Sequence, residues 1–86
     1  MAKKNTVTQK QVDDIFKEST VNEFIAFNKC LIVSCKLSNG FTIVESSACV
    51  DVDNFDLKIG RDICKDRIKN KLWELEGYKL QCELNK

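Results

Sequence analysis

The chain has 86 residues, of which 43% are apolar and 31% charged, a composition that is typical of globular proteins and excludes a disordered chain. A chain of this length builds one hydrophobic core, so a second domain is excluded. The net charge of +1 gives no general attraction to nucleic acid or to a membrane surface, and neither is expected as a partner. No apolar run approaches the roughly 20 residues of a membrane span.

The N-terminal part predicts a polar arm followed by a helix. Residues 1–7 are polar and carry lysines, and we expect a flexible arm here, with residues 8–86 forming a single small domain. Thr8 and Gln11 have the spacing of a capping box at a helix start. Apolar residues then recur at helical spacing: Val12, Ile15 and Phe16, followed by Val21, Phe24, Ile25 and Phe27. The second group either extends the helix beyond a bend near Ser19 or forms a separate turn, and we favour the helix.

The next two segments predict a β-hairpin. Residues 29–37 and 41–48 are β-prone, and they flank Asn39–Gly40, the preferred pair for a two-residue type I′ turn. Closure by two residues places Ser38 opposite Phe41 and thereby fixes the strand register. That register pairs Leu37 with Thr42, Cys35 with Val44, Val33 with Ser46 and Leu31 with Ala48.

The two faces of this hairpin differ in their expected neighbours. The face formed by these four pairs is mostly apolar, and we expect it to pack on the long helix predicted below. The opposite face includes Ile32, Phe41 and Ile43 and is too apolar to be a simple solvent face. A two-stranded ribbon is marginally stable alone, so we expect the first helix or another subunit to cover this face.

A long helix is predicted over about residues 54–76. Asp53 can cap its start, and Gly77 is a natural left-handed stop. At 100° per residue the helix has two apolar stripes: Leu57, Cys64, Ile68, Leu72 and Leu75 on one side, and Phe55, Ile59, Ile63 and Trp73 on the other. A helix with two apolar sides must be covered on both, so the hairpin covers one, and the first helix or a partner chain covers the other.

Two glycine positions complete the fold prediction. Gly60 lies within the long helix, where glycine costs about 1 kcal/mol relative to alanine, and a close crossing by another element would compensate for it. After Gly77 the apolar residues Tyr78, Leu80, Cys82 and Leu84 alternate with polar ones, which predicts a short C-terminal strand, with a short helix as the alternative. The predicted fold class is therefore α+β.

The residue types argue against catalysis. There is no histidine, which removes the commonest general base near neutral pH and the usual partner of a serine or cysteine nucleophile. The five cysteines lack CxxC spacing and are interpreted as reduced thiols, several of them buried. The acidic residues Asp51, Asp53 and Asp56 lack the spacing of a calcium loop and are interpreted as turn and cap residues. We expect a protein that is not an enzyme and has no metal or other cofactor.

A basic strip on the long helix is the one candidate binding feature. Lys58, Arg61, Lys65 and Lys69 lie within about three turns and are suited to contact phosphates. Asp62 interleaves with them, as does Asp66, so ion pairs on a solvated helix face are the alternative interpretation.

Several motifs together resemble a known phage family. These motifs are Asn39–Gly40–Phe41, residues 45–51 (ESSACVD), Asn54–Phe55–Asp56, Ile59–Gly60–Arg61 and residues 72–78 (LWELEGY). They resemble a family of small proteins from tailed bacteriophages and prophages, named after gene products 49 and 66 of two podoviruses, from about Val7 to Leu80. The pair Ser46–Ser47 departs from the glycine–glutamate–serine pattern expected there. The resemblance implies a protein made in the bacterial cytoplasm, and it carries over no catalytic residue because the family has no assigned activity.

Three functions follow as hypotheses. The first is counter-defence: the protein binds and sequesters a nucleotide immune signal, with Lys58, Arg61, Lys65 and Lys69 on the phosphates and Trp73 or Tyr78 stacking on a base. The second is an inhibitor that docks on a host or defence protein through Ile32, Phe41 and Ile43. The third is an oligomeric accessory protein, in which self-association covers the second apolar side of the helix. A homo-oligomer is expected under all three hypotheses.

Overall fold

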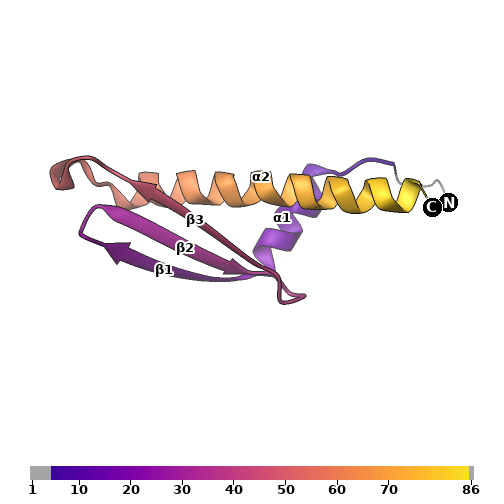
Figure 1. Ribbon diagram of the computed structural model, residues 1–86, viewed down its shortest axis with the longest axis horizontal. Helices are drawn as coiled ribbons and strands as arrows, with labels where there is room; N and C mark the ends of the chain where they lie inside the picture. Colours follow the sequence, from indigo (N-terminus) through magenta and orange to yellow (C-terminus); the bar gives the residue numbers. More distant parts are fainter. Residues whose placement is uncertain (1–4, 86) are drawn as a thin grey trace.

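The computed structural model describes residues 5–85 and confirms an α+β fold (Figure 1). Its elements, in chain order, are α1 (Gln9–Lys17), β1 (Thr20–Ala26), β2 (Cys30–Lys36), β3 (Thr42–Ala48), the short 3-10 helix η1 (Val52–Asn54) and α2 (Leu57–Leu84). The strands form one antiparallel sheet in the order β1-β2-β3. The long helix lies over β3 and β2 but not over β1, and its C-terminal part extends past the sheet (Figure 1).

The predicted start of the first helix is confirmed. The Thr8 side chain accepts from the Gln11 backbone N–H, and the Gln11 side chain accepts from the Thr8 N–H, so both halves of the capping box are present. The helix is amphipathic, and Val12 on its apolar side is fully buried. Of the predicted flexible arm, residues 1–4 lie outside the described residues, whereas Val7 packs against the core.

The segment after Ser19 corrects a prediction, because residues 20–26 form the strand β1 and not a continued helix. Val21, Phe24 and Ile25 have spacing that suits a helix, but the segment is also rich in the β-branched and aromatic residues that suit a strand. All seven residues of β1 pair with β2, from Thr20 opposite Lys36 to Ala26 opposite Cys30. Pairing with a neighbouring strand therefore outweighs the local helical pattern.

A tight turn joins β1 to β2. Phe27 and Asn28 both have positive φ, 55° and 58°, and the Lys29 N–H donates to the Ala26 carbonyl at 3.2 Å. Positive φ at both central residues is the requirement of a type I′ turn. Asparagine tolerates this conformation, but a bulky phenylalanine there is strained by about 1–3 kcal/mol.

The turn between β2 and β3 differs from the predicted two-residue closure. The Leu37 N–H donates to the Phe41 carbonyl, the Gly40 N–H donates to the Leu37 carbonyl, and Gly40 has φ of 94°. This is a three-residue loop of 38–40 in which glycine occupies the left-handed position, the pattern of a type I turn with a bulge. Asn39 adds to the closure because its side-chain oxygen accepts from the Phe41 N–H.

The extra loop residue shifts the register by one, so the predicted register is wrong. Cys35 is paired with Ile43 and not with Val44. A shift of one residue exchanges the two faces of a strand. Ile43 is consequently buried against α2, with 4% of its surface exposed, whereas Val44 on the opposite face is 58% exposed.

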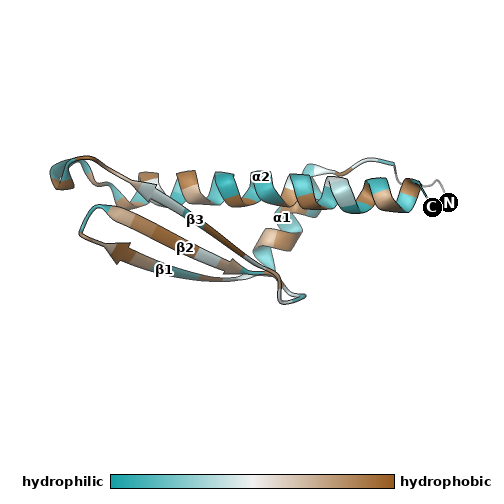
Figure 2. Cartoon of the chain, viewed as in Figure 1, coloured by the Kyte–Doolittle hydropathy of each residue, from teal (hydrophilic) through white to brown (hydrophobic). Residues whose placement is uncertain are grey.

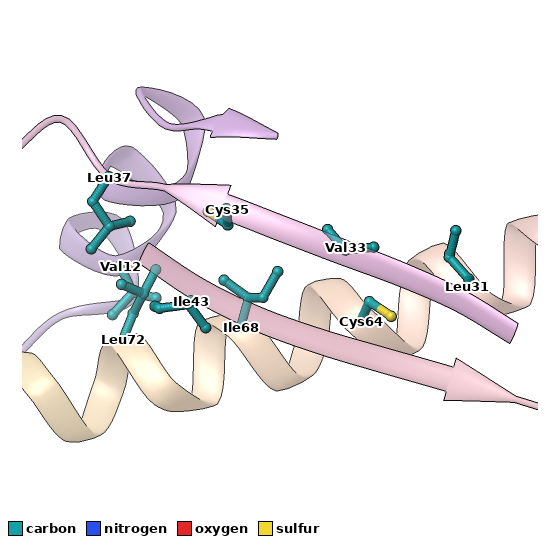
Figure 3. Close-up of a cluster of buried hydrophobic side chains, with 9 residues drawn as sticks. All are labelled: Val12, Leu31, Val33, Cys35, Leu37, Ile43, Cys64, Ile68 and Leu72. Carbon is teal, nitrogen blue, oxygen red and sulfur yellow. The ribbon is translucent and has the colours of Figure 1, made fainter. Parts of the chain in front are cut away.

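The core lies between the helices and β2, with one contribution from β3 (Figure 3). Its buried side chains are Val12 from α1, Leu31, Val33 and Cys35 from β2, Leu37 just beyond β2, Ile43 from β3, and Cys64, Ile68 and Leu72 from α2. The predicted first stripe of the long helix is thus confirmed as the core stripe. The close crossing predicted at Gly60 is also present, because a Cβ at that position would lie 3.3 Å from Leu31 Cδ2.

The ends of the long helix correct two predictions. Asp56 caps α2 by accepting from the Ile59 N–H, whereas Asp53 lies in η1 with its N–H bonded to the Asp51 side chain. The helix does not stop at Gly77 but continues to Leu84, so the C-terminal segment is helical, the alternative considered above. None of the three described strands lies beside this segment to pair with it, and its leucine, lysine, glutamine and glutamate residues favour a helix.

Candidate binding surfaces

The basic strip of α2 is engaged in contacts within the chain. Arg61 makes a forked pair with Glu23 of β1, with Nε–Oε2 and Nη2–Oε1 distances of 2.8 and 2.9 Å. This pairing raises the pKa of Arg61, first through the hydrogen bond and then through the charge of Glu23. Lys58 pairs with Asp62 one turn along α2 at 3.1 Å, an exposed pair of the kind that stabilises little.

The other two cations of the strip join α2 to α1. Lys69 Nζ lies 2.8 Å from Asp13 Oδ1, and this hydrogen bond, assisted by one from Gln9, lowers the pKa of Asp13. Lys65 and Lys69 also lie over the ring of Phe16, at 5.7 and 5.6 Å from its centre. The strip therefore serves mainly to hold β1 and α1 against the long helix.

The two aromatic residues proposed for base stacking lie apart. Trp73 is half-buried and packs against the core, whereas Tyr78 is 75% exposed on the part of α2 that extends past the sheet. The structure does not bring the four cations and these two rings together into one site.

The three residues proposed as a protein contact also lie on different surfaces. Ile32 is on the face of the sheet turned away from α2, Ile43 is buried beneath α2, and Phe41 follows the β2–β3 turn. The grouping rested on the two-residue turn, and it fails because the register is shifted by one. The prediction of Ile43 as a contact residue is wrong, because Ile43 is a buried core residue.

The outer face of the sheet, which we define by Phe24, Ile32 and Val44, is the surface that the shifted register exposes. Phe24 lies directly opposite Ile32, and Val44 lies diagonally across from Ile32, opposite Ser34. Phe24 is 59% exposed, similar to Val44, and none of the helices within residues 5–85 covers this side of the sheet (Figure 1). Apolar residues accordingly extend along much of β1 and β2, beyond the positions that face the core (Figure 2).

A groove lies where α2 extends past the sheet. It has a volume of about 410 Å³ and is bounded by α1, the β2–β3 turn and α2. Its lining residues are Ile15, Leu37, Ser38, Asn39, Phe41, Leu72, Leu75, Glu76 and Lys79. The mixture of apolar walls, one half-exposed aromatic ring and one lysine is suited to a small amphipathic ligand. Sequence reasoning missed it because its residues come from three separate segments.

The thiols and carboxylates of residues 5–85 do not gather into a metal-binding cluster. The cysteines are free, Cys35 and Cys64 are buried as predicted, and burial raises the pKa of the Cys64 thiol. Across this part of the chain, no three histidine, cysteine, aspartate or glutamate side chains converge as metal ligands would. None of the helices described has both the length and the apolar character needed to cross a membrane.

Comparison with known proteins gives one match. The model of the phage protein (N4 Gp49/phage Sf6 gene 66) family matches residues 7–84, a range that contains every helix and strand described above. Searches of curated proteins and of solved structures found no match. The family match confirms the resemblance seen in the sequence motifs.

Proposed function

The chain belongs to the phage protein family named after N4 Gp49 and Sf6 gene 66, and from this premise we propose that it is an accessory protein that acts in the cytoplasm of the infected bacterium without catalysis, by docking on a host or defence protein. The observation that carries the proposal is the outer face of the sheet. Phe24 and Val44 are exposed there, and the partly buried Ile32 lies between them on the central strand.

The chemistry of this face favours a protein over a nucleotide as its partner. The apolar centre is flanked by small polar residues on the same face, Asn22, Ser34 and Ser46, and by Lys36 at its end. An apolar centre with a polar rim is the usual arrangement of protein interfaces, whose energy is concentrated in a few central aromatic or aliphatic anchors. Phosphate recognition would instead require several free cations, whereas three of the four cations of the α2 strip are paired with carboxylates and the fourth, Lys65, lies over the Phe16 ring.

The test is affinity capture from bacterial lysate with two matched variants. Phe24→Glu places a charge in the centre of the outer face, and Phe41→Glu makes the same change on an equally accessible ring outside it. We expect the wild type and Phe41→Glu to retain the same specific protein and Phe24→Glu to lose it. Retention by Phe24→Glu, or loss by Phe41→Glu alone, would contradict docking through the outer face.

A second candidate is the sequestration of a nucleotide immune signal, which the groove favours. Its volume of about 410 Å³ lies within the usual range of small-ligand sites. Phe41 is available for stacking on a base and Lys79 for a phosphate, in place of the paired cations of the strip.

This candidate is tested by calorimetric titration with cyclic nucleotides and ADP-ribose derivatives. We expect heat and a rise in melting temperature for one ligand, both lost in Lys79→Gln and both kept in Lys58→Gln. Absence of heat and of any melting shift across the panel would exclude the candidate.

A further inference from the structure

The backbone hydrogen bonds of the sheet leave one set of groups on β1 without a partner strand. The Leu37 N–H donates to Phe41 and the Cys49 N–H donates to Lys29, so the odd-numbered residues of β2 bond to β3. In an antiparallel sheet these bonds alternate, and the even-numbered residues of β2 therefore bond to β1. It follows that the N–H and C=O groups of Val21, Glu23 and Ile25 point to the free edge.

The two edge strands of the sheet differ in how their outward backbone groups are protected. The same alternation turns the carbonyl of Ser46 outward on β3, and Arg67 of α2 donates a hydrogen bond to it. Native proteins commonly block exposed edges with charged side chains, prolines or bulges. Within the described residues, β1 has no proline or lysine, and its one charged side chain, Glu23, is paired with Arg61. The pairing of β1 with β2 runs through all seven residues without interruption, and α2 does not lie over β1.

From these observations we propose that β1 pairs with β1 of a second copy of the chain, antiparallel, about a two-fold axis at Glu23. This register places Val21 opposite Ile25 of the second copy and the reverse, and it joins all seven residues of each strand through about six backbone hydrogen bonds. The product is a continuous six-stranded sheet with both α2 helices on the same side.

Alternative registers fit less well. Because the outward backbone groups belong to odd-numbered residues, the strands can slide only in steps of two. A slide of one step in either direction shortens the pairing and places Glu23 opposite Val21 or Ile25, a charged side chain against an apolar one. On the face turned toward α2, only the register about Glu23 pairs the two apolar residues of β1, Val21 and Ile25, with each other, while on the outer face it places Phe24 opposite Asn22.

The charges at the axis are compatible with this pairing. Two carboxylates directly opposite each other would normally repel, but each Glu23 is already held in a forked ion pair by Arg61. The axis therefore brings together two Glu–Arg pairs, and each arginine can also attract the carboxylate of the other copy.

The strained turn provides an independent argument. Phe27 is 86% exposed in a conformation unfavourable for a bulky residue. Continued past the end of the strand, the proposed register brings Phe27 opposite Ser19 of the second copy, at the junction of α1 and β1. A ring covered at this junction would offset the strain of its backbone. The proposal does not depend on the function proposed above, because the partner here is another copy of the chain.

The test is the molecular mass in solution, measured by light scattering between about 1 and 500 µM, a range suited to a small interface of this class. We expect the mass to rise from one copy to two. Val21→Lys and Ile25→Glu should each raise the dissociation constant at least tenfold, because each places a charge opposite an apolar residue.

The combination of the two changes is specific for the register. The double variant Val21→Lys/Ile25→Glu places lysine opposite glutamate in both rows and should restore the dimer, whereas Val44→Lys on the outer face of β3 should leave it unchanged. Circular dichroism of each variant checks that the monomer is folded. A wild type that stays monomeric throughout, or a folded double variant that dimerises no better than the single ones, would overturn the proposal.

Discussion

The two edge strands of the sheet have similar lengths but different surroundings. In β3, Ile43 is buried beneath α2, and Arg67 occupies an outward carbonyl of the strand. In β1, Val21 lies in the same row of the same face, on the other side of Cys35, and is 41% exposed. The difference arises because α2 lies over β3 and β2 and not centrally over the sheet. A single helix thus covers one edge strand of this sheet and leaves the other uncovered.

The largest expected effect is on stability, when Ile43 of β3 and Val21 of β1, which flank Cys35 on the same face, are each shortened to alanine. Ile43→Ala removes a buried side chain from a packed core and should lower the free energy of unfolding by about 2–4 kcal/mol. Val21→Ala, measured by urea denaturation at a concentration where the protein is monomeric, should cost less than about 1 kcal/mol because its site is partly solvated. Val44→Ala serves as the control for the register. A larger loss for Val44→Ala than for Ile43→Ala would contradict the three-residue turn.

The next largest effect is the difference in stability between glycine-to-alanine changes at Gly60, where α2 packs on the sheet, and at Gly77, near the end of α2. Gly77 has nothing within 4 Å of an added Cβ, so Gly77→Ala should stabilise the protein by about 0.5–1 kcal/mol through helix propensity. Gly60→Ala should gain less or destabilise, because its Cβ would meet the fully buried Leu31 at 3.3 Å. Thermal denaturation of the two variants measures this difference, and equal stabilisation at both sites would contradict the close packing at Gly60.

A smaller effect on stability is expected at the blocked edge. Arg67→Ala should change the free energy of unfolding by no more than about 1 kcal/mol, since the side chain is exposed. It opens the β3 edge, however, and should add species larger than a dimer in light scattering. Lys71→Ala, an exposed cation on the same helix, is the control. If Arg67→Ala leaves the mass distribution of the wild type unchanged, Arg67 does not protect this edge.

The smallest effect is a pH dependence in the contact between the helices. Lys69 lowers the pKa of Asp13 below its ordinary value of 3.8 in the folded protein. The stabilisation is therefore present above pH 3.8 and is lost as the pH falls through the lower folded pKa. Melting temperatures between pH 7 and 2 should show a shallower acid decline for Asp13→Asn than for the wild type. Parallel declines would exclude this contribution.

Much of the fold follows from local rules. The capping box of Thr8 and Gln11, the core stripe of α2 and the close approach at Gly60 were each predicted from the local sequence, and each is present. The strand β1 was missed because its stability comes from pairing with β2, which its own apolar spacing does not reveal. The register was missed because Asn–Gly suits both two-residue and three-residue loops.

The candidate sites were less predictable for the same reason. The cations of the α2 strip could be listed from the sequence, but their partners Glu23 and Asp13 come from distant segments. Likewise, the outer face of the sheet depends on β1 and on the shifted register, so Ile32 is the one residue of the proposed contact Ile32, Phe41 and Ile43 that lies on it. Helix-local patterns predicted the scaffold, whereas the exposed surfaces are products of strand pairing.

The most direct test of the contrast between the edges is hydrogen exchange of individual β1 amides, measured by NMR at low and high protein concentration. We predict that the amides of Asn22 and Phe24, which bond to β2, are protected at both concentrations. Those of Val21, Glu23 and Ile25 should exchange rapidly in dilute protein and become protected as the concentration rises. If these three amides exchange rapidly at every concentration, β1 does not pair with a second copy, and the account of an edge left for that partner is contradicted.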